Sequence, residues 1–364
     1  MRNVISSGVE RRYVVFAPGA FAGRAAKTAH GVIAYSRDAV VAVVDPEHAG
    51  QRVCDVVPYL HSEAPIVATV RESLRFGPTA LLIGIAPPGG ALPPAYRAEI
   101  AFALQSKLEV VNGLHAFLND DAELRALAEA HDSRIWDLRM PPAAPLFSGA
   151  AYDVKSRIVL TVGSDCAVGK MTAALELTRA AQAAGTAAEF VPTGQTGIAI
   201  AGWGTSIDRV IADFASGASE QLVLEGDRRI AARDGILFVE GQGGIAHPGY
   251  APVTLALLYG CAPDALILVH LVTRTKVDGH DIPLPGYRAL IRTYEGLCAN
   301  VKPARVIGVA LNTHGLGDDA ARAAIDEARA QTGLPCDDLL RFGPDAFYAA
   351  LAPQIGKTAV RTDG

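Results

Sequence analysis

Short apolar runs alternate with amphipathic stretches along the first half of the chain. The runs at 40–45 and 80–86 are almost continuously apolar, which is typical of parallel strands buried on both faces. The stretches at 94–106 and 121–131 have helical character. Strands separated by helices predict an α/β domain with a parallel sheet and helices on both faces. The strands predicted here are 13–17, 40–45, 65–70, 80–86, 109–111 and 134–138.

A proline-rich segment at 140–156 interrupts this alternation. Pro141, Pro142 and Pro145 remove backbone donors and fix φ, and Gly149 follows them. This composition indicates a linker, so we predict one domain at 1–145 and a second at 146–364. The alternation resumes after the linker and predicts a second α/β domain, with strands at 158–162, 188–191, 235–239, 265–269 and 305–311.

The first strand of the second domain leads into a glycine-bounded loop and a helix predicted at 173–183. This order points backbone N–H groups and the positive end of a helix dipole at one spot. Lys170 adds a positive charge for phosphate oxygens, and Gly169 lets the backbone approach a ligand. The sequence therefore predicts a phosphate-binding P-loop made of Gly163, Ser164, Asp165, Cys166, Ala167, Val168, Gly169, Lys170, Met171 and Thr172.

The loop departs from the usual G-x-x-x-x-G-K-[ST] pattern in two ways. Five residues separate Gly163 from Gly169, so Ser164 stands where the first glycine is usual. Met171 occupies the position whose hydroxyl normally binds Mg²⁺, and Thr172 follows it. Phosphate binding is the prediction, and a tight strand–helix turn with a surface lysine is the alternative.

Acidic and imidazole side chains follow the strand predicted at 235–239. Glu240 opens a glycine-rich loop that also contains His247. A carboxylate at the end of a parallel strand beside a P-loop strand is placed for metal binding or catalysis. Asp208 is a candidate to complete a cluster with Glu240, and a helix-start role is its alternative.

Two further loops offer groups for a substrate. Thr193, Gln195 and Thr196 lie in a predicted loop rich in glycine and hydroxyl groups. Arg274 and Lys276 follow the strand predicted at 265–269, and two cations so close together suit an anionic ligand. A solvated basic loop is the alternative for this pair.

Composition narrows the classes of function. The 364 residues carry a net charge of -5, which argues against a nucleic-acid binder with its basic stripe. No apolar run approaches the roughly 18 residues of a membrane helix, and 1–12 lacks the apolar core of a signal peptide. Five scattered cysteines without a C-x-x-C pair indicate reduced thiols. A cytoplasmic enzyme that acts on a small molecule is the expectation.

The P-loop and the V-E-G-Q-G-G sequence at 239–244 resemble the dethiobiotin synthetase and cobyric-acid synthase branch of P-loop proteins. Together with V-P-T-G-Q-T-G at 191–197 and E-G-Q-G-x-x-x-H-P at 240–248, they more closely resemble a bacterial family once catalogued as a domain of unknown function. This family is sometimes labelled NAD-dependent epimerase/dehydratase, and one branch of it is D-glutamate N-acetyltransferase. The resemblance covers essentially the whole chain and implies a Rossmann-like N-terminal domain.

The resemblance implies acetyl-CoA as co-substrate, an acidic D-amino acid as acceptor and D-amino-acid catabolism as the setting. The P-loop would then hold the phosphates of coenzyme A, and a homo-oligomer is expected. Glu240 is the first choice for the general base, with Asp208 and His247 as second choices. Thr193, Gln195, Thr196, Arg274 and Lys276 are the candidates for substrate binding. The main alternative is an ATP- and Mg²⁺-dependent ligase or kinase of the dethiobiotin synthetase type, and a nucleotide-sensing module is a third class.

Two details refine these expectations. The first strand leads into Pro18 without a G-x-G-x-x-G fingerprint, so we expect no NAD site, and Asp45 before Pro46 is expected to have a capping or turn role. Cys166, at a helix N-terminus beside a lysine, would have a lowered pKa. An acetyl-cysteine intermediate is therefore conceivable, and a small side chain that fits the loop is the alternative.

Overall fold

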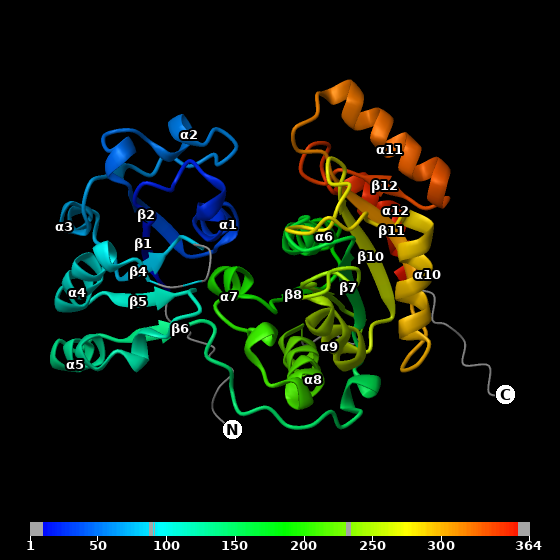
Figure 1. Cartoon of the computed structure of the whole chain (residues 1–364), viewed down its shortest axis with the longest axis horizontal. Coiled ribbons are helices and arrows are strands. Elements are labelled where there is room, and N and C mark those ends of the chain that lie inside the picture. Colours follow the sequence, from blue (N-terminus) through cyan, green and yellow to red (C-terminus); the bar gives the residue numbers. More distant parts are fainter. Residues whose placement is uncertain (1–9, 87–89, 91, 231–233, 356–364) are drawn as a thin grey trace. The chain divides into compact units, whose positions relative to one another are not determined.

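The computed structural model describes residues 10–86, 90, 92–230 and 234–355, and most of the segment that bears on the signal-peptide prediction lies outside this part. The chain divides into two compact units, Met1–Pro142 with Gly194–Arg209 and Ala143–Thr193 with Val210–Gly364. Figure 1 shows a parallel sheet with helices in each unit. The sequence placed Gly194–Arg209 in the second domain, whereas the structure groups this segment with the first unit.

The first unit contains a six-stranded parallel sheet with the order β3-β2-β1-β4-β5-β6. This is the strand order of Rossmann dinucleotide-binding folds, and the Rossmann-like prediction is confirmed. The apolar runs form the sheet's interior, for example Val14, Val15 and Leu81, none of which is exposed. The strands are β1 Arg12–Phe16, β2 Ala39–Val44, β3 Ile66–Val67, β4 Ala80–Ile83, β5 Glu109–Asn112 and β6 Ile135–Asp137.

Among the described residues, five α-helices follow the strands of the first unit, and one α-helix from later in the sequence joins them. The predicted stretches at 94–106 and 121–131 form α4 Arg97–Gln105 and α5 Ala122–Ala130. Helix α7 Gln195–Ala201 belongs to this unit and contacts α1. The other helices are α1 Lys27–Tyr35, α2 Val53–Val56 and α3 Val70–Ser73.

The second unit contains another six-stranded parallel sheet, with the order β12-β11-β10-β7-β9-β8. Its strands are β7 Arg157–Gly163, β8 Ala188–Val191, β9 Ile236–Val239, β10 Ala265–Leu271, β11 Arg305–Asn312 and β12 Cys336–Asp337. Strand β12 was not predicted, because a two-residue strand carries no periodic signal. The P-loop strand β7 lies between β10 and β9, so the loops after these three strands meet at one edge of the sheet.

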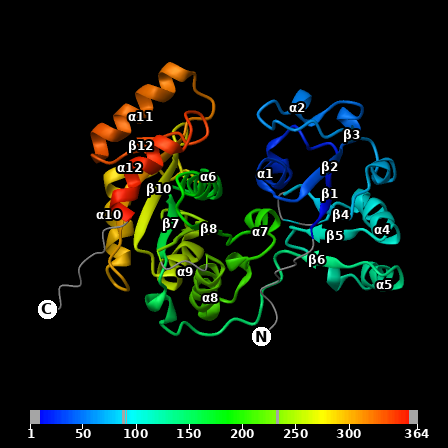
Figure 2. The same ribbon diagram turned by 180° about the vertical axis from the view of Figure 1, so that it is seen from behind.

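Helices cover both faces of the second sheet, as Figures 1 and 2 show from opposite sides. Helices α6 and α12 pack together on one face, and α8, α9 and α10 contact one another in series on the other. None of the described helices is both long enough and apolar enough to cross a bilayer. The helices are α6 Lys170–Ala183, α8 Ala212–Ile230, α9 Ala251–Cys261, α10 Tyr287–Cys298, α11 Asp318–Thr332 and α12 Asp345–Ile355.

The linker predicted at 140–156 is fixed to the second unit by a buried carboxylate. Glu220 lies in α8 with none of its surface exposed. It accepts hydrogen bonds from Ser148 N at 2.9 Å, Ser148 Oγ at 2.8 Å and Ala151 N at 3.2 Å. Three donors compensate the cost of burying this charge, so the linker is anchored by Glu220 rather than by apolar packing alone.

Candidate functional site

The predicted P-loop is a loop between a strand and a helix. Strand β7 ends at Gly163, and α6 begins at Lys170, three residues before the predicted start. Gly169 has φ +114°, a conformation that side chains with a Cβ rarely adopt. Lys170 therefore occupies the first turn of α6, where backbone N–H groups lack helical partners and an anion is stabilised.

Lys170 is buried and connects two loops. Its Nζ donates to Asp165 O at 2.7 Å and to Gly243 O at 2.6 Å, and the residue is 6% exposed. Burial lowers the pKa of this ammonium to about 8. An ammonium has three N–H donors, so one donor remains for a phosphate oxygen after these two hydrogen bonds.

The glycine-rich loop that follows β9 packs directly against the P-loop. Gly241 N donates to Thr161 Oγ1 at 2.9 Å. A Cβ on Gly244 would lie 2.6 Å from Asp165 Cα, a distance that real Cβ atoms do not reach. Glycine at 244 thus permits the two loops to touch, and the predicted closeness of these two motifs is present in the structure.

Glu240 and Thr193 are brought together at the ends of neighbouring strands. Val191 of β8 pairs with Val239 of β9, so the residues that follow lie side by side. Glu240 is 6% exposed, and its Oε2 accepts a hydrogen bond from Thr193 N at 2.9 Å. Thr193 Oγ1 in turn donates to Glu240 O at 2.7 Å. The carboxylate is therefore held in one position close to the P-loop strand.

Asp165 links the P-loop to the loop after β10. Its buried carboxylate accepts from Cys166 N at 2.7 Å, Asp278 N at 2.6 Å and Arg274 Nη1 at 3.1 Å. Arg274 Nη1 also donates to Cys166 O at 2.9 Å. Arg274 is thus engaged in shaping the P-loop, whereas Lys276 forms an exposed ion pair with Asp281.

Cys166 does not have the lowered pKa expected from its position. Burial raises the pKa of the thiol to about 11, and the nearby carboxylates of Asp165 and Asp278 add to this rise. The thiol donates toward Asp278 Oδ2 at 3.7 Å. The prediction of an activated thiol was wrong, because burial, together with the negative charge of Asp165 and Asp278, outweighs the positive charge of Lys170 and Arg274.

His247 lies beside these residues. It is 5% exposed, and one of its ring nitrogens lies within 4.8 Å of both Cys166 Sγ and an Asp165 carboxylate oxygen. Such a group could hold a divalent cation in principle. Here, however, Asp165 is already compensated by Arg274, and His247 Nδ1 accepts a hydrogen bond from Gly249 N at 3.0 Å.

Three residues predicted for the site lie in the first unit. Gln195 and Thr196 lie in helix α7, not in the predicted loop, because Ile198, Ala199 and Ile200 bury an apolar helix after Gly194. Thr196 Oγ1 forms a hydrogen bond with Thr28 Oγ1 at 2.9 Å. The third residue, Asp208, forms an ion pair with Arg139 of the same unit.

Sequence reasoning missed two residues that support the P-loop. His270 Nδ1 forms a hydrogen bond with Ser164 Oγ at 2.8 Å, and burial lowers the pKa of this imidazole to about 4. Tyr294 OH donates to Gly163 O at 2.6 Å and accepts from Ile245 N at 3.1 Å. His270 could have been found from its place at the end of a predicted strand. Tyr294 lies within α10 and has no local signal.

Asp45, the acidic residue considered for an NAD site, has a local structural role in the first unit. Asp45 caps the short 3₁₀ helix Pro46–His48, which confirms its predicted capping role. Its Oδ1 accepts from Gly19 N at 2.7 Å, and its Oδ2 pairs with His48 Nδ1 at 2.7 Å. Both carboxylate oxygens are thus engaged within the fold.

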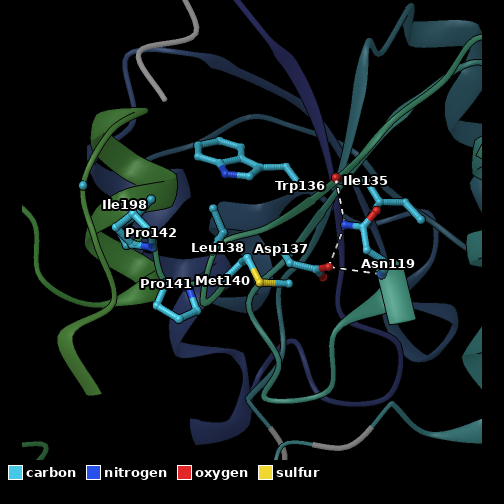
Figure 3. A pocket seen from close by; sticks show the side chains of 10 residues that line it. Asn119, Ile135, Trp136, Asp137, Leu138, Met140, Pro141, Pro142 and Ile198 are labelled. Atoms are coloured by element: carbon cyan, nitrogen blue, oxygen red, sulfur yellow. Dashed lines mark hydrogen bonds between the residues drawn. The ribbon is translucent and has the colours of Figure 1, made fainter. Parts of the chain in front are cut away.

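A cavity of about 180 Å³ also lies in the first unit (Figure 3). Asp137 is its only acidic lining residue among those described. The Asp137 carboxylate accepts from Asn112 Nδ2 at 2.7 Å, Leu118 N at 3.0 Å and Asn119 Nδ2 at 2.7 Å. This charge is satisfied by the fold, and the described lining includes no Lys or Arg, so the cavity offers no cation to an acidic substrate.

Comparison with known proteins identifies the family. Residues 145–348 match the domain of unknown function DUF1611_C, described as a P-loop domain, and residues 46–141 match DUF1611_N, described as a Rossmann-like domain. The chain belongs to the DUF1611 family. The predicted resemblance to a family of this description is confirmed.

Relatives within the family include one of known structure and two with curated names. The crystal structure of a DUF1611 family protein from Anabaena variabilis ATCC 29413 matches with a TM-score of 0.88 and 39% identity, over 94% of this chain and 99% of that one. A protein named D-glutamate N-acetyltransferase from Tritonibacter scottomollicae is 37% identical over 287 residues, 78% of this chain and 84% of the relative. A protein of the same name from Pseudoalteromonas sp is 34% identical over 285 residues, with the same coverage.

Proposed function

We propose that this protein transfers an acetyl group from acetyl-CoA to the amine of D-glutamate. The names of the two curated relatives support this activity. Within this chain, the observation that carries the proposal is Met171, which follows Lys170 in the first turn of α6. A thioether is a poor ligand for the hard cation Mg²⁺. This P-loop therefore suits a phosphate ligand that needs no metal for its chemistry, and coenzyme A is such a ligand.

The P-loop holds the phosphate end of the donor in this proposal. The first-turn N–H groups of α6 and the Lys170 ammonium supply positive potential in a buried setting. Asp165 and Arg274 keep the loop in shape through the hydrogen bonds described above. The acetyl group itself reacts at the other end of the donor.

Glu240 is the proposed general base. In the reaction, the amine nitrogen of D-glutamate forms a bond to the thioester carbon, and the carbon–sulfur bond breaks to release the thiolate of coenzyme A. Glu240 accepts the proton lost by the amine, and that proton finally neutralises the thiolate. Thr193 holds the Glu240 carboxylate through its N–H, so it is a positioning residue here.

The acceptor's two carboxylates need cationic or hydrogen-bonding partners. Lys276 is the most accessible candidate, because its pair with Asp281 is exposed and such pairs contribute little. Arg274 can contribute through Nη2, which lies 3.5 Å from the exposed Asp278. Gln195, Thr196 and Asp208, which lie in the first unit, stay predictions.

The test runs acetyl-CoA and Mg²⁺-ATP side by side against D- and L-amino acids. We expect release of free thiol from acetyl-CoA with acidic D-amino acids, and we expect this release to persist in EDTA. Glu240→Gln should reduce the release sharply, whereas exposed Glu123→Gln serves as the matched control. Formation of ADP that depends on an acceptor, without thiol release for any amino acid, would establish the ligase or kinase alternative instead.

A further inference from the structure

The hydrogen bond between Gly249 and His247 fixes the proton on the imidazole ring. Gly249 N donates to His247 Nδ1 at 3.0 Å, so Nδ1 presents a lone pair. A neutral imidazole carries one N–H, and the proton must therefore be on Nε2. His247 is in this state a hydrogen-bond donor at Nε2 and has no open acceptor with which to take a proton from a substrate.

The ring is held rigidly in this orientation. It stacks on Tyr250 with 4.2 Å between ring centroids and an interplanar angle of 27°. The ring of His280 approaches its edge at 5.2 Å. Since the residue is 5% exposed, the ring cannot turn over without disturbing these neighbours and the Gly249 hydrogen bond.

The His247 ring lies beside the P-loop, where a phosphate would bind. A ring nitrogen of His247 is within 4.8 Å of Cys166 Sγ, in the middle of the P-loop. The same glycine-rich loop provides Gly243 O to the Lys170 ammonium at 2.6 Å. Among the described residues, no hydrogen bond engages His247 Nε2. His247 thus has an N–H without an acceptor among the described residues, in a ring beside an anion cradle, and this N–H is available to donate to a bound anion.

We propose that His247 donates its Nε2–H to a phosphate bound in the P-loop and is neither the general base nor a metal ligand. A metal on Nε2 would require the ring proton on Nδ1, where the Gly249 N–H already donates. The proposal rests on the proposed function only in naming coenzyme A as the source of the phosphate. The chemistry it requires is that of a pyrophosphate group.

Substitution of His247 by glutamine or by asparagine distinguishes the roles of its two ring nitrogens. The amide nitrogen of glutamine reaches the place of Nε2, whereas that of asparagine reaches only the place of Nδ1. We expect His247→Gln to bind inorganic pyrophosphate and acetyl-CoA within about threefold of the wild type in calorimetric titrations. His247→Asn and His247→Ala should each bind about tenfold more weakly, the usual effect of losing a hydrogen bond to a charged group.

Two controls show that a change in affinity does not come from a loss of folding stability or from the acetyl part of the donor. Thermal unfolding of the wild type and of all three variants reports any loss of fold, and inorganic pyrophosphate tests the phosphate cradle without the acetyl donor. Equal affinity for pyrophosphate in His247→Gln and His247→Ala would overturn the inference, as would absence of pyrophosphate binding by the wild type. Pyrophosphate binding that depends on His247, in a protein that does not bind acetyl-CoA, would refute the proposed function and support the inference.

Discussion

The lowered pKa of Lys170 predicts that the affinity for acetyl-CoA, the proposed donor, depends on pH. Burial brings the pKa of this ammonium to about 8, so the charged form is fully present well below pH 8 and is lost as pH rises through that value. At pH 7 the charged form exceeds the neutral form about tenfold. If only the charged form binds phosphate, the affinity falls roughly tenfold for each pH unit above about 8.

Calorimetric titration of acetyl-CoA without acceptor between about pH 7 and pH 9.5 measures this directly. The wild type should show a plateau followed by a decline, and Lys170→Ala should bind at least tenfold more weakly with no decline, because a hydrogen bond to a charged group contributes about 1.5–3 kcal/mol. Lys170→Ala also removes the donor to two backbone carbonyls, so thermal unfolding must accompany it. An unchanged wild-type affinity up to pH 9.5, or the same decline in Lys170→Ala, would refute the reasoning.

Three further predictions follow from other residues. Cys166→Ser should retain acetyl transfer, and mass spectrometry should find no acetyl-cysteine, because the pKa of about 11 keeps the thiol protonated at neutral pH; an inactive but folded Cys166→Ser protein would contradict this. Calorimetry should detect no saturable NAD binding in the micromolar range, since Gly19 and His48 engage the Asp45 carboxylate, and micromolar binding would reverse the assignment. Glu220→Ala should lower the free energy of unfolding by about 1–3 kcal/mol in chemical denaturation, because it leaves the Ser148 and Ala151 donors unpaired. A loss no larger than that of the exposed control Glu123→Ala would exclude the anchoring role.

The sequence predicted those elements whose local pattern is strong. Apolar runs such as β10 and the glycine–lysine pair at the start of α6 are visible in a short window. Helix α7 was missed because Gly194, Gln195 and Thr196 resemble a loop, whereas the tertiary environment buries the apolar residues that follow. Propensity is a weak guide where burial decides the conformation.

The site depends on a strand order that no local pattern contains. Strand β9 lies between β7 and β8 although β8 precedes it in the chain. This order places Glu240 next to Thr193 and brings the glycine-rich loop onto the P-loop. Sequence reasoning could assign both loops to the carboxyl edge of a parallel sheet. It could not show that Tyr294, from a distant helix, donates to Gly163 O.

If coenzyme A is the ligand, as proposed, its length constrains what a residue beside the P-loop can do. The pantetheine arm from the pyrophosphate to the sulfur has about 12 bonds, equal to about four residues of extended chain, and therefore spans about 14 Å. Glu240 lies in the loop that contacts the P-loop, so it meets the thioester only if the arm folds back over that loop. A base acts on the chemical step, whereas a residue at the phosphate end acts on donor binding. A loss of kcat in Glu240→Gln would thus show that Glu240 acts on the chemical step and that the donor folds back to reach it. A rise in KM alone would show that Glu240 acts at the phosphate end, and another residue would then have to accept the proton.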